Sequence, residues 1–454
     1  MKLAMLGGGG FRTPLVYGAL LRDRHERRVD EVWLHDVDEE RLAAIGRVLA
    51  EMADGDPDAP RVRTSTDLDT ALEGSDFVFS AIRVGGLEGR TADERVALDL
   101  GLLGQETTGP GGLAYGLRTV PVALHVAERV AAVAPDAWVI NFTNPAGMIT
   151  EAMQSVLHDR VVGICDSPIG LARRAAATLG IDPARTTVDY VGLNHLGWLR
   201  GLHFDGRDVL PDLLADDAAL ASMEEGQLFG LDWVRTLGVV PNEYLYYYYF
   251  TRDAVRSITA APQTRGEYLL DQQQGFYASL RSGGPSGPGG SGALAEWDRV
   301  RMERNATYMQ EARGEDEERD EADVQGGGYE GVALAIMAAI SRGEPAELIL
   351  NVRSRGTVPG LPDDAVVEVP CTVDASGPRP HPLPPLTGHP LGLVEQVKAV
   401  ERLVIAAART GSERDAVQAF ALHPLVDSVT VARELLAGYR ARIPAVDAVF
   451  ARGR

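Results

Sequence analysis

The first half of the chain alternates short apolar runs with segments of helical periodicity. Residues 2–6 are apolar and lead into four consecutive glycines, and apolar positions then recur with a helical period from about residue 14 to residue 22. A further apolar run over residues 31–38 ends in acidic residues. Short apolar runs bounded by turn residues are typical of buried strands, and a 3.6-residue period is typical of a helix. The pattern therefore predicts a strand, a glycine turn, a helix and a second strand.

Three more strand-like runs follow, over residues 77–82, 138–142 and 161–165. Strands that alternate with helical segments predict an α/β fold with a Rossmann-like, doubly wound parallel sheet in the N-terminal part. Functional groups gather at the carboxyl ends of the strands in such sheets. Asn144 and Cys165 follow strand ends of this kind, so we expect them at the functional edge.

The pattern changes after about residue 170, where helical stretches and polar loops dominate. Strand candidates lie near residues 187–205 and 346–373, and alanine-rich helices are expected near residues 398–422. We therefore expect a Rossmann-like domain over residues 1–168 and an α+β domain over residues 169–454.

Two segments of the second domain have unusual composition. Residues 282–292 contain only glycine, serine and proline, which predicts a disordered loop. Residues 314–323 form an acidic run, which is typical of a solvated helix face or a mobile segment.

The glycine turn has the features of a dinucleotide-binding loop. Glycines occupy the first two key places of that fingerprint, and the third is occupied by Arg12. Glycines allow the tight turn and let the backbone approach a pyrophosphate at the helix N-terminus. Asp36 lies at the end of the second strand, where a carboxylate binds ribose hydroxyls and repels a 2′-phosphate, which favours NAD. Any strand–turn–helix unit can use glycines in its turn. The preceding strand, the following helix and Asp36 together favour a dinucleotide-binding loop over an ordinary turn. The candidate cofactor-binding residues are Gly7, Gly9, Gly10, Phe11, Arg12 and Asp36.

Composition narrows the class of protein. The net charge is −21, which disfavours nucleic acid and anionic membranes as partners, so an anionic substrate would need a local cluster of arginines. Only two cysteines are present, Cys165 and Cys371, which fits a reduced compartment rather than a disulfide scaffold. No apolar run is long enough to span a bilayer or to form a signal peptide. A cytoplasmic protein is therefore expected.

An ordered set of short motifs covers most of the chain. The motifs are residues 104–112 (GQETTGPGG), 117–121 (LRTVP), 141–147 (NFTNPAG), 165–168 (CDSP), 192–195 (GLNH), 244–245 (YL), 264–267 (TRGE), 361–364 (LPDD) and 369–371 (VPC). Together they resemble glycoside hydrolase family 4, the NAD- and divalent-metal-dependent glycosidases, which do not use the usual pair of carboxylates. The resemblance implies a lactate/malate dehydrogenase-like arrangement, with NAD in the first domain and substrate, metal and oligomer contacts in the second.

The resemblance also implies a reaction. NAD takes a hydride from C3 of the sugar, and the resulting ketone makes the C2 proton acidic. A divalent metal, usually manganese in the family, binds the C2 and C3 oxygens and stabilises the enolate. A base removes the C2 proton, the C1–O bond breaks by elimination, water adds, and the hydride returns.

Three residues are implied as metal ligands and base. Cys165 and His195 supply a thiolate and an imidazole for a first-row divalent metal, and Tyr244 corresponds to the family's base. Taken singly, each residue has a structural alternative to metal binding. The cysteine would be a buried thiol at a strand end, and the histidine would be a hydrogen-bonded loop residue. The tyrosine run over residues 244–249 also reads as an aromatic packing element. Relatives often carry arginine where this chain has Tyr246.

Asp166 and its surrounding motifs point to different substrate anomers within the family. Family members that cleave 6-phospho-α-glucosides have aspartate at this place, where it is thought to protonate the leaving oxygen, and members that cleave 6-phospho-β-glucosides commonly have asparagine. Residues 85–90 and 264–265 are closer to the β-type. A purely structural alternative for Asp166 is a carboxylate bound to the helix N-terminus before Pro168.

The remaining candidates surround the substrate. Arg90 and Arg265 correspond to family positions near the sugar phosphate, where arginine suits bidentate recognition; surface ion pairing is the alternative. Arg83 is expected with the cofactor, and Asn144 is expected to orient sugar or metal-bound hydroxyls.

The sequence thus predicts a 6-phospho-β-glucosidase acting on phosphorylated disaccharides or glucosides, as a homodimer or homotetramer. Three alternatives stay open: a 6-phospho-α-glucosidase, an NAD-dependent hydroxy-acid dehydrogenase, and an NAD-sensing regulator that has lost its chemistry. A regulator would have no use for a metal pair and a base, which disfavours it.

Overall fold

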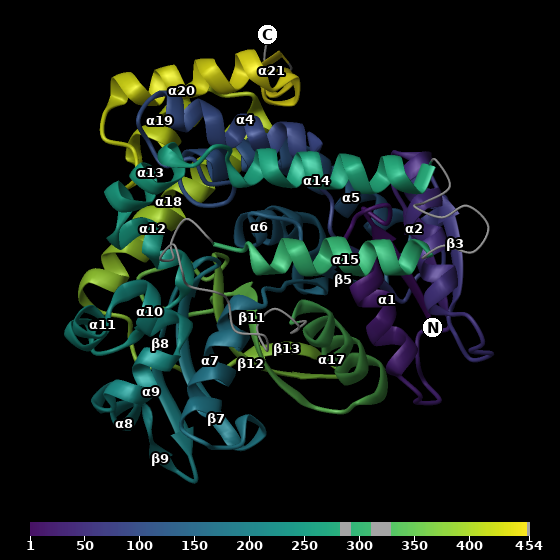
Figure 1. The fold of residues 1–454 in the computed structure, drawn as a ribbon, viewed down its shortest axis with the longest axis horizontal. Helices are drawn as coiled ribbons and strands as arrows, with labels where there is room; N and C mark the ends of the chain where they lie inside the picture. The colour runs from purple at the N-terminus through teal and green to yellow at the C-terminus, as the bar shows by residue number, and fades with distance from the viewer. Residues whose placement is uncertain (282–291, 310–327, 452–454) are drawn as a thin grey trace.

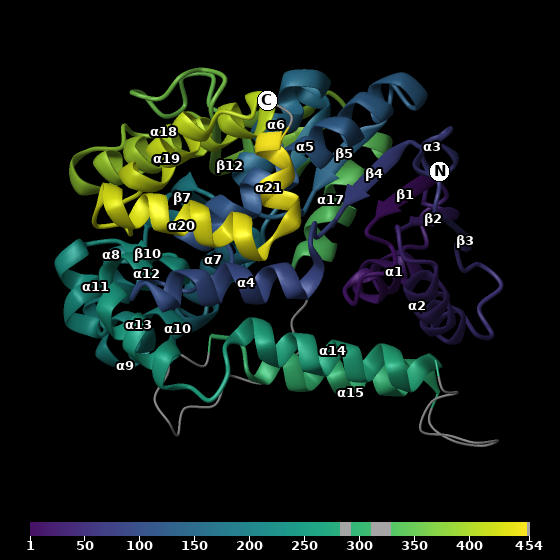
Figure 2. The same ribbon diagram turned by 90° about the horizontal axis from the view of Figure 1, so that it is seen from above.

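The computed structural model describes residues 1–281, 292–309 and 328–451. Most of the glycine-rich segment 282–292 and all of the acidic run 314–323 lie outside the described residues. Figures 1 and 2 show the chain from two directions. Within the described ranges, no helix is both long and apolar enough to cross a membrane.

One continuous 13-stranded sheet runs through the chain, in the order β10-β8-β7-β12-β11-β6-β5-β4-β1-β2-β3, with β13 beside β12 and β9 beside β8. The strands are β1 (Lys2–Leu6), β2 (Glu31–His35), β3 (Arg61–Ser65), β4 (Phe77–Ser80), β5 (Trp138–Asn141), β6 (Val161–Gly163), β7 (Thr186–Leu193), β8 (Leu196–Phe204), β9 (Arg207–Asp208), β10 (Val240–Pro241), β11 (Ala346–Arg353), β12 (Val366–Asp374) and β13 (Gly377–Pro380).

The N-terminal strands confirm the doubly wound sheet. The order β6-β5-β4-β1-β2-β3 is parallel throughout, and it brings the ends of β1, β2, β4, β5 and β6 to one edge. The sequence pattern missed β3, whose residues RVRTS include a single strongly apolar side chain. An edge strand has little to bury, so it carries little hydrophobic signal.

The second part of the chain extends this sheet with antiparallel strands. β11 pairs with β6 through Asn351 and Gly163, and β12 and β7 continue from there. The strand candidates near residues 187–205 form one hairpin, β7–β8, and Leu193 pairs with Leu196. Asn194 and His195 are therefore the two turn residues of that hairpin.

Helices cover both faces of the sheet. In the N-terminal part they are α1 (Thr13–Arg22), α2 (Glu39–Met52), α3 (Leu68–Leu72), α4 (Gly86–Asp99), α5 (Pro110–Val133), α6 (Ala146–Leu157) and α7 (Ser167–Thr178). In the C-terminal part they are α8 (Leu210–Ala215), α9 (Asp217–Ser222), α10 (Glu224–Phe229), α11 (Leu231–Leu237), α12 (Tyr246–Tyr249), α13 (Thr251–Ala260), α14 (Arg265–Arg281), α15 (Ala293–Ala306), α17 (Tyr329–Arg342), α18 (Gly388–Thr410), α19 (Glu413–Leu422), α20 (Val429–Arg442) and α21 (Pro444–Ala451). The short 3₁₀ segments are η1 (His158–Arg160), η2 (Pro183–Arg185) and η3 (Glu243–Leu245).

The two faces bury separate cores. In β1, Leu3 and Met5 face one core, and Ala4 and Leu6 face the other, as the two-residue period of a strand requires. The core that receives Ala4 and Leu6 is built largely from α5, α6 and α18 to α21. Figure 2 shows α14 and α15 side by side below α4, and both helices also pack on α2. This places C-terminal helices next to the cofactor half of the sheet.

Candidate functional site

The glycine turn leaves β1 and enters α1 in the geometry expected for anion binding. Gly7 has a φ of 78°, and a Cβ on Gly10 would lie 2.8 Å from the Gly7 carbonyl oxygen. The backbone N–H groups of Phe11 and Arg12 donate to no acceptor in the described parts of the chain, and the first turn of α1 has no acidic residue. Two free N–H groups at a helix N-terminus fit a pyrophosphate.

Asp36 lies beside this turn, directly after β2. Its Oδ2 accepts a hydrogen bond from the Gly9 N–H at 3.1 Å, and its Oδ1 accepts one from the Asp38 N–H at 3.2 Å. The carboxylate is half-buried at the edge of the loop. This position fits a ribose diol and the preference for NAD.

Three aromatic side chains from the C-terminal half bind the carbonyl oxygens of the same turn. The Tyr277 hydroxyl donates to the Gly9 oxygen at 2.7 Å, and the Trp297 indole N–H donates to the Phe11 oxygen at 2.8 Å. The Tyr329 hydroxyl donates to the Arg12 oxygen at 3.2 Å. Sequence reasoning missed these residues because they come from three separate helices with no shared motif.

Tyr244 and His195 form a stacked pair. His195 is the second turn residue of the β7–β8 hairpin and has a φ of 62°, in the left-handed region that side chains rarely adopt. Its ring lies 3.6 Å from the Tyr244 ring, centroid to centroid, with 8° between the planes. The Tyr244 hydroxyl accepts a hydrogen bond from the Tyr308 hydroxyl at 2.9 Å. The structure thus brings the predicted base against the predicted metal ligand.

Cys165 belongs to the same group. It is buried two residues beyond β6, and its Sγ lies 4.0 Å from Oδ1 of Asp166. Burial raises the pKa of the Cys165 thiol, and the charges of Glu368 and Asp166 add to this effect. Burial also lowers the pKa of His195 to about 4. The imidazole is therefore neutral at pH 7, which is the form that binds a metal.

The donors present fit a divalent metal with an open coordination shell. A thiol and a neutral imidazole are soft and borderline donors that suit first-row metals. Among the residues that the structure describes, no group of three or more His, Cys, Asp or Glu side chains forms a complete metal cluster. A metal held by Cys165 and His195 would accordingly take its other ligands from substrate and water.

Asp166 occupies the N-cap position of α7, but its carboxylate accepts no hydrogen bond from that helix. Its charge instead acts on Arg12, where it raises the guanidinium pKa, and on His195. The helix-capping alternative for Asp166 is therefore wrong. A Cβ on Gly328 would lie 2.5 Å from the Asp166 Cβ, so the start of α17 packs closely against this residue.

Arginines gather next to this group, and Glu106 organises two of them. Arg90 donates to Glu94 and to Glu106, both at 2.8 Å, and Arg83 donates to Glu106 at 2.6 Å. Burial alone would raise the pKa of Glu106, but the charges of Arg83 and Arg90 outweigh it and lower the value to about 2. Arg90 is thus a buried, ion-paired residue rather than a surface one.

Arg304 is a further functional candidate that sequence reasoning missed. Burial and the nearby charges of Arg12, Arg265 and Arg90 hold its guanidinium pKa well below the ordinary range. Within the described residues, Arg304 has no carboxylate partner. Arg265 binds the backbone oxygen of residue 304 at 2.7 Å and the Thr307 hydroxyl at 2.5 Å. A cluster of guanidinium groups whose charges repel one another favours an anion as ligand.

The tyrosine run divides between two roles. Tyr246 is buried, stacks on Phe250 at 5.3 Å between ring centroids and meets Phe229 edge-on. It therefore packs in the aromatic cluster, whereas Tyr244 faces His195. Asn144 is half-buried before a cis bond to Pro145, and the neighbouring Ala146 N–H donates to the Asn194 side chain at 3.2 Å.

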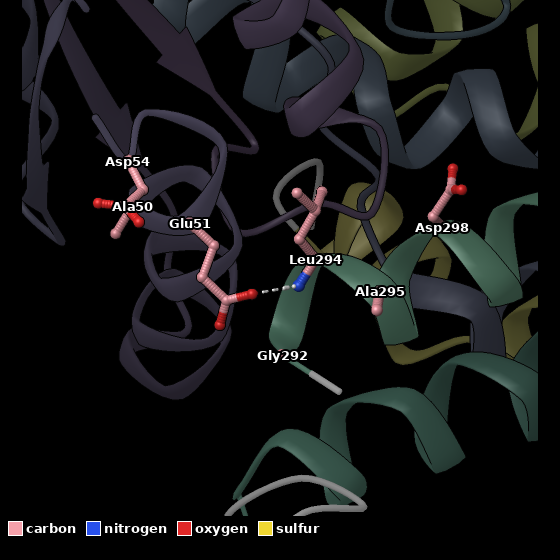
Figure 3. Close-up of a pocket in the computed structure, with 7 residues that line it drawn as sticks. All are labelled: Ala50, Glu51, Asp54, Gly292, Leu294, Ala295 and Asp298. Carbon is pink, nitrogen blue, oxygen red and sulfur yellow. Dashed lines mark hydrogen bonds between the residues drawn. The ribbon is translucent and has the colours of Figure 1, made fainter. Parts of the chain in front are cut away.

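An open groove of about 790 Å³ lies elsewhere, between the end of α2 and the start of α15 (Figure 3). It exposes Glu51, Asp54 and Asp298, and Glu51 accepts a hydrogen bond from the Leu294 N–H at 2.9 Å. Glu51 is roughly 18 Å along α2 from Glu39, the first residue of that helix, by the rise of an α-helix. The groove is separate from the candidate site.

The fold is a dinucleotide-binding α/β sheet extended by antiparallel strands, and comparison with known proteins identifies its family. The family model described as "Family 4 glycosyl hydrolase" matches residues 2–181, and the model of the family's C-terminal domain matches residues 190–426. The chain therefore belongs to family 4 of the glycosyl hydrolases, and the resemblance inferred from the motifs is confirmed.

Individual relatives agree with this assignment. The chain is 31% identical over 447 residues to a probable 6-phospho-beta-glucosidase of Bacillus subtilis (strain 168), covering 96% of this chain and 95% of the relative. The structure of the 6-phospho-beta glucosidase from Thermotoga maritima with manganese, NAD+ and glucose-6-phosphate matches with a TM-score of 0.80 and 26% identity, over 97% of this chain and 98% of that one. A 6-phospho-alpha-glucosidase from gut microorganisms, in complex with NAD and glucose-6-phosphate, matches with a TM-score of 0.83 and 25% identity, over 98% of each chain.

Proposed function

We propose that this enzyme hydrolyses 6-phospho-β-glucosides with the help of NAD and a divalent metal, manganese in the first instance. The observation that carries the proposal is the cluster of Arg12, Arg90, Arg265 and Arg304. Their charges act on one another, Arg265 binds the Arg304 carbonyl oxygen, and the charge of Asp166 acts on Arg12. In a chain with a net charge of −21, a cluster of guanidiniums that repel one another favours an anionic ligand. A sugar phosphate supplies that anion and places the sugar against the stacked Tyr244.

The two expected cofactors have matching residues. The turn from Gly7 to Arg12 and the carboxylate of Asp36 would hold NAD, and Cys165 and His195 would hold the metal. When bound, NAD supplies a hydride acceptor that is restored within one turnover, and the metal supplies a Lewis acid for the sugar oxygens.

Tyr244 is proposed as the base that takes the C2 proton on its phenolic oxygen. Burial raises the pKa of this tyrosine, so in the empty site it is a neutral phenol. A cation held at the adjacent His195 would favour the phenolate. The base would therefore form only when the site is loaded.

Asp166 is proposed as the proton donor to the leaving oxygen. Its carboxyl group accepts no hydrogen bond from the α7 amides, so in its protonated form it is free to give its proton to the leaving oxygen. The same residue favours the second candidate, a 6-phospho-α-glucosidase, which the similar fold of a 6-phospho-alpha-glucosidase also supports. Asn144 is proposed to orient the sugar hydroxyls.

The test is a side-by-side assay of the two nitrophenyl 6-phosphoglucoside anomers with manganese, NAD and reductant. We expect faster hydrolysis of the β-anomer, slower reaction or loss of label with C2-deuterated substrate, and no activity after both cofactors are removed. Faster hydrolysis of the α-anomer would establish the second candidate. Full activity without cofactors would overturn both, and steady release of NADH would indicate a dehydrogenase.

Three further proposals concern the location, the oligomeric state and the domain division of the enzyme. We propose that the enzyme works in the cytoplasm, as a homodimer or homotetramer, and that residues 1–168 form the NAD domain and residues 169–454 the substrate, metal and oligomerisation domain. A reduced compartment suits the two free cysteines, because oxidation of Cys165 would remove a metal ligand. Light scattering after size-exclusion chromatography measures the oligomer.

A further inference from the structure

Thr107, in the loop before α5, contacts one ring nitrogen of His195. The proposed reaction assigns no role to this contact. The Thr107 hydroxyl lies 3.0 Å from Nδ1 of His195. The same hydroxyl lies 3.1 Å from Oε1 of Gln105. Thr107 therefore stands between a residue of its own loop and a turn residue of the β7–β8 hairpin, 88 positions along the chain.

The Gln105 side chain has a fixed orientation. Its Oε1 lies 2.6 Å from the Thr107 backbone nitrogen and 2.6 Å from the Thr108 backbone nitrogen. Backbone N–H groups only donate, so the side-chain atom that faces them must be the carbonyl oxygen and not the NH₂ group. At the Thr107 hydroxyl, Gln105 can therefore act only as an acceptor.

This orientation decides the direction of the next hydrogen bond. A threonine hydroxyl has one hydrogen to donate and two lone pairs that accept. If its hydrogen goes to Gln105, the hydroxyl can only accept from His195, so Nδ1 must carry the proton. The opposite assignment would set two oxygens 3.1 Å apart with no hydrogen between them.

We infer that Gln105 and Thr107 lock His195 in the Nδ1–H tautomer, so that Nε2 is the one ring nitrogen with a lone pair for a metal. Partners of this kind fix the tautomer and ring orientation of metal-binding histidines. Thr107 and Gln105 are thus positioning residues that act through His195. The role in metal binding rests on the proposed function, whereas the tautomer can be measured without it.

The neighbouring threonine offers a matched control. Thr108 is buried, and its hydroxyl has no hydrogen-bond partner among the described residues. Thr107→Val and Thr108→Val make the same chemical change in adjacent positions, and only the first removes the contact with His195. Thr107→Ser keeps a hydroxyl and should rescue the lock.

The first experiment measures the tautomer in the full-length, metal-stripped protein labelled with ¹⁵N-histidine. Nitrogen–proton correlation spectra distinguish a protonated from an unprotonated ring nitrogen, and His195→Asn identifies the signal by its loss. We expect a protonated Nδ1 and a bare Nε2 in the wild type, in Thr107→Ser and in Thr108→Val, and a shift toward Nε2–H in Thr107→Val. A protonated Nε2 in the wild type overturns the inference.

The second experiment titrates manganese alone into each variant and measures the dissociation constant by electron paramagnetic resonance. Loss of a partner behind a metal ligand typically weakens binding 10- to 100-fold, and we expect about this loss in Thr107→Val only. Equal affinity in the two valine variants, or equal weakening in all three variants, overturns the inference. If Thr107→Val does not fold, the wild-type spectrum and Thr107→Ser still decide. Neither readout needs turnover, so failure of the glycosidase proposal would be seen separately, in the anomer assay.

Discussion

At the scale of single residues, the site combines side chains whose charged forms are unfavourable while no ligand is bound. Cys165 is buried and Tyr244 is half-buried, and burial raises the pKa values of both acids. Arg304 is a half-buried cation whose pKa is lowered. Each penalty falls when a charge of the opposite sign arrives, the metal for the first two and a phosphate for the third. The empty site is therefore prepared for its ligands electrostatically.

Tyr244→Phe should lower kcat about 10²- to 10⁴-fold, the usual contribution of a general base. Manganese and NAD binding should stay within about threefold, because the phenyl ring can still stack on His195. Tyr249→Phe is the control, since that hydroxyl accepts a hydrogen bond from the Trp198 indole and does not contact His195 in the described residues. Steady-state kinetics and cofactor titration measure both effects, and an active Tyr244→Phe enzyme would assign the base elsewhere.

Arg304→Met should raise KM for phosphorylated substrate about 10- to 100-fold, as expected when a hydrogen bond to a charged group is lost. The same change should raise the melting temperature of the empty enzyme, because it removes a cation that Arg12, Arg265 and Arg90 repel. Arg299→Met on the same helix is the control, since Arg299 pairs with Glu296 and Glu303 at the surface. A lower KM or a lower melting temperature in Arg304→Met would contradict the anion pocket.

The sequence predicts some of these residues and not others for a physical reason. Cys165 and His195 follow strand ends in recognisable motifs, so their neighbourhood can be inferred from the topology. Arg304 stands in a helix that also carries Arg299 and Arg301, and no spacing distinguishes it from them. Its role depends on charges that approach from three other elements, and a linear pattern does not contain that information.

At the scale of elements, hydrophobic periodicity predicts the buried strands and fails at the edges. β4 is buried along its whole length, whereas β3 is mostly exposed and has no comparable pattern. The paired strands β7 and β8 are predicted as a strand region, but their turn is not. The left-handed φ of His195 is imposed by the two-residue connection, and histidine has no intrinsic preference strong enough to announce it.

The end of α19 should give the enzyme a pH-dependent stability. His423 is buried there, its Nδ1 accepts a hydrogen bond from the Leu425 N–H at 3.1 Å, and burial lowers its pKa to about 3. In the unfolded chain the pKa is about 6.5, so between pH 3 and pH 6.5 the unfolded state binds the extra proton. Stability should therefore fall as the pH drops through this window.

His423→Asn removes this titration and keeps an acceptor near Nδ1. Between pH 7 and pH 4.5, the urea midpoint of the wild type should fall more steeply than that of the variant. Equilibrium urea unfolding followed by circular dichroism measures the two slopes. Parallel slopes would show that His423 contributes no linkage.

At the scale of the whole molecule, the two parts of the chain share one sheet, and helices of the second part bind the cofactor turn of the first. The sheet passes from parallel to antiparallel strands through a single residue pair, Asn351 and Gly163, and a Cβ on Gly163 would lie 2.8 Å from the Asn351 Cβ. So short a junction has little effect on the hydrophobic pattern of the sequence. That pattern changes near residue 170, where helical stretches and polar loops begin to dominate. The continuity of the sheet could not be predicted from that change.

This arrangement predicts one cooperative unfolding transition that NAD moves as a unit. Ligand at about 100 times its Kd should add about 2.7 kcal/mol to the free energy of unfolding. Differential scanning calorimetry with NAD, and with NADP as the control that Asp36 should disfavour, measures the shift. Two separate transitions, of which NAD moves only one, would contradict the coupling.

The hydrogen bond from Trp297 to the Phe11 oxygen has an optical consequence. The chain has five tryptophans, and this indole touches the backbone turn that would carry the pyrophosphate. Its emission should therefore respond when the turn is occupied, and a Trp297→Phe protein should lose that response while its four other tryptophans still emit. The enzyme thus carries its own reporter of cofactor occupancy, which can be read without substrate and without any added dye.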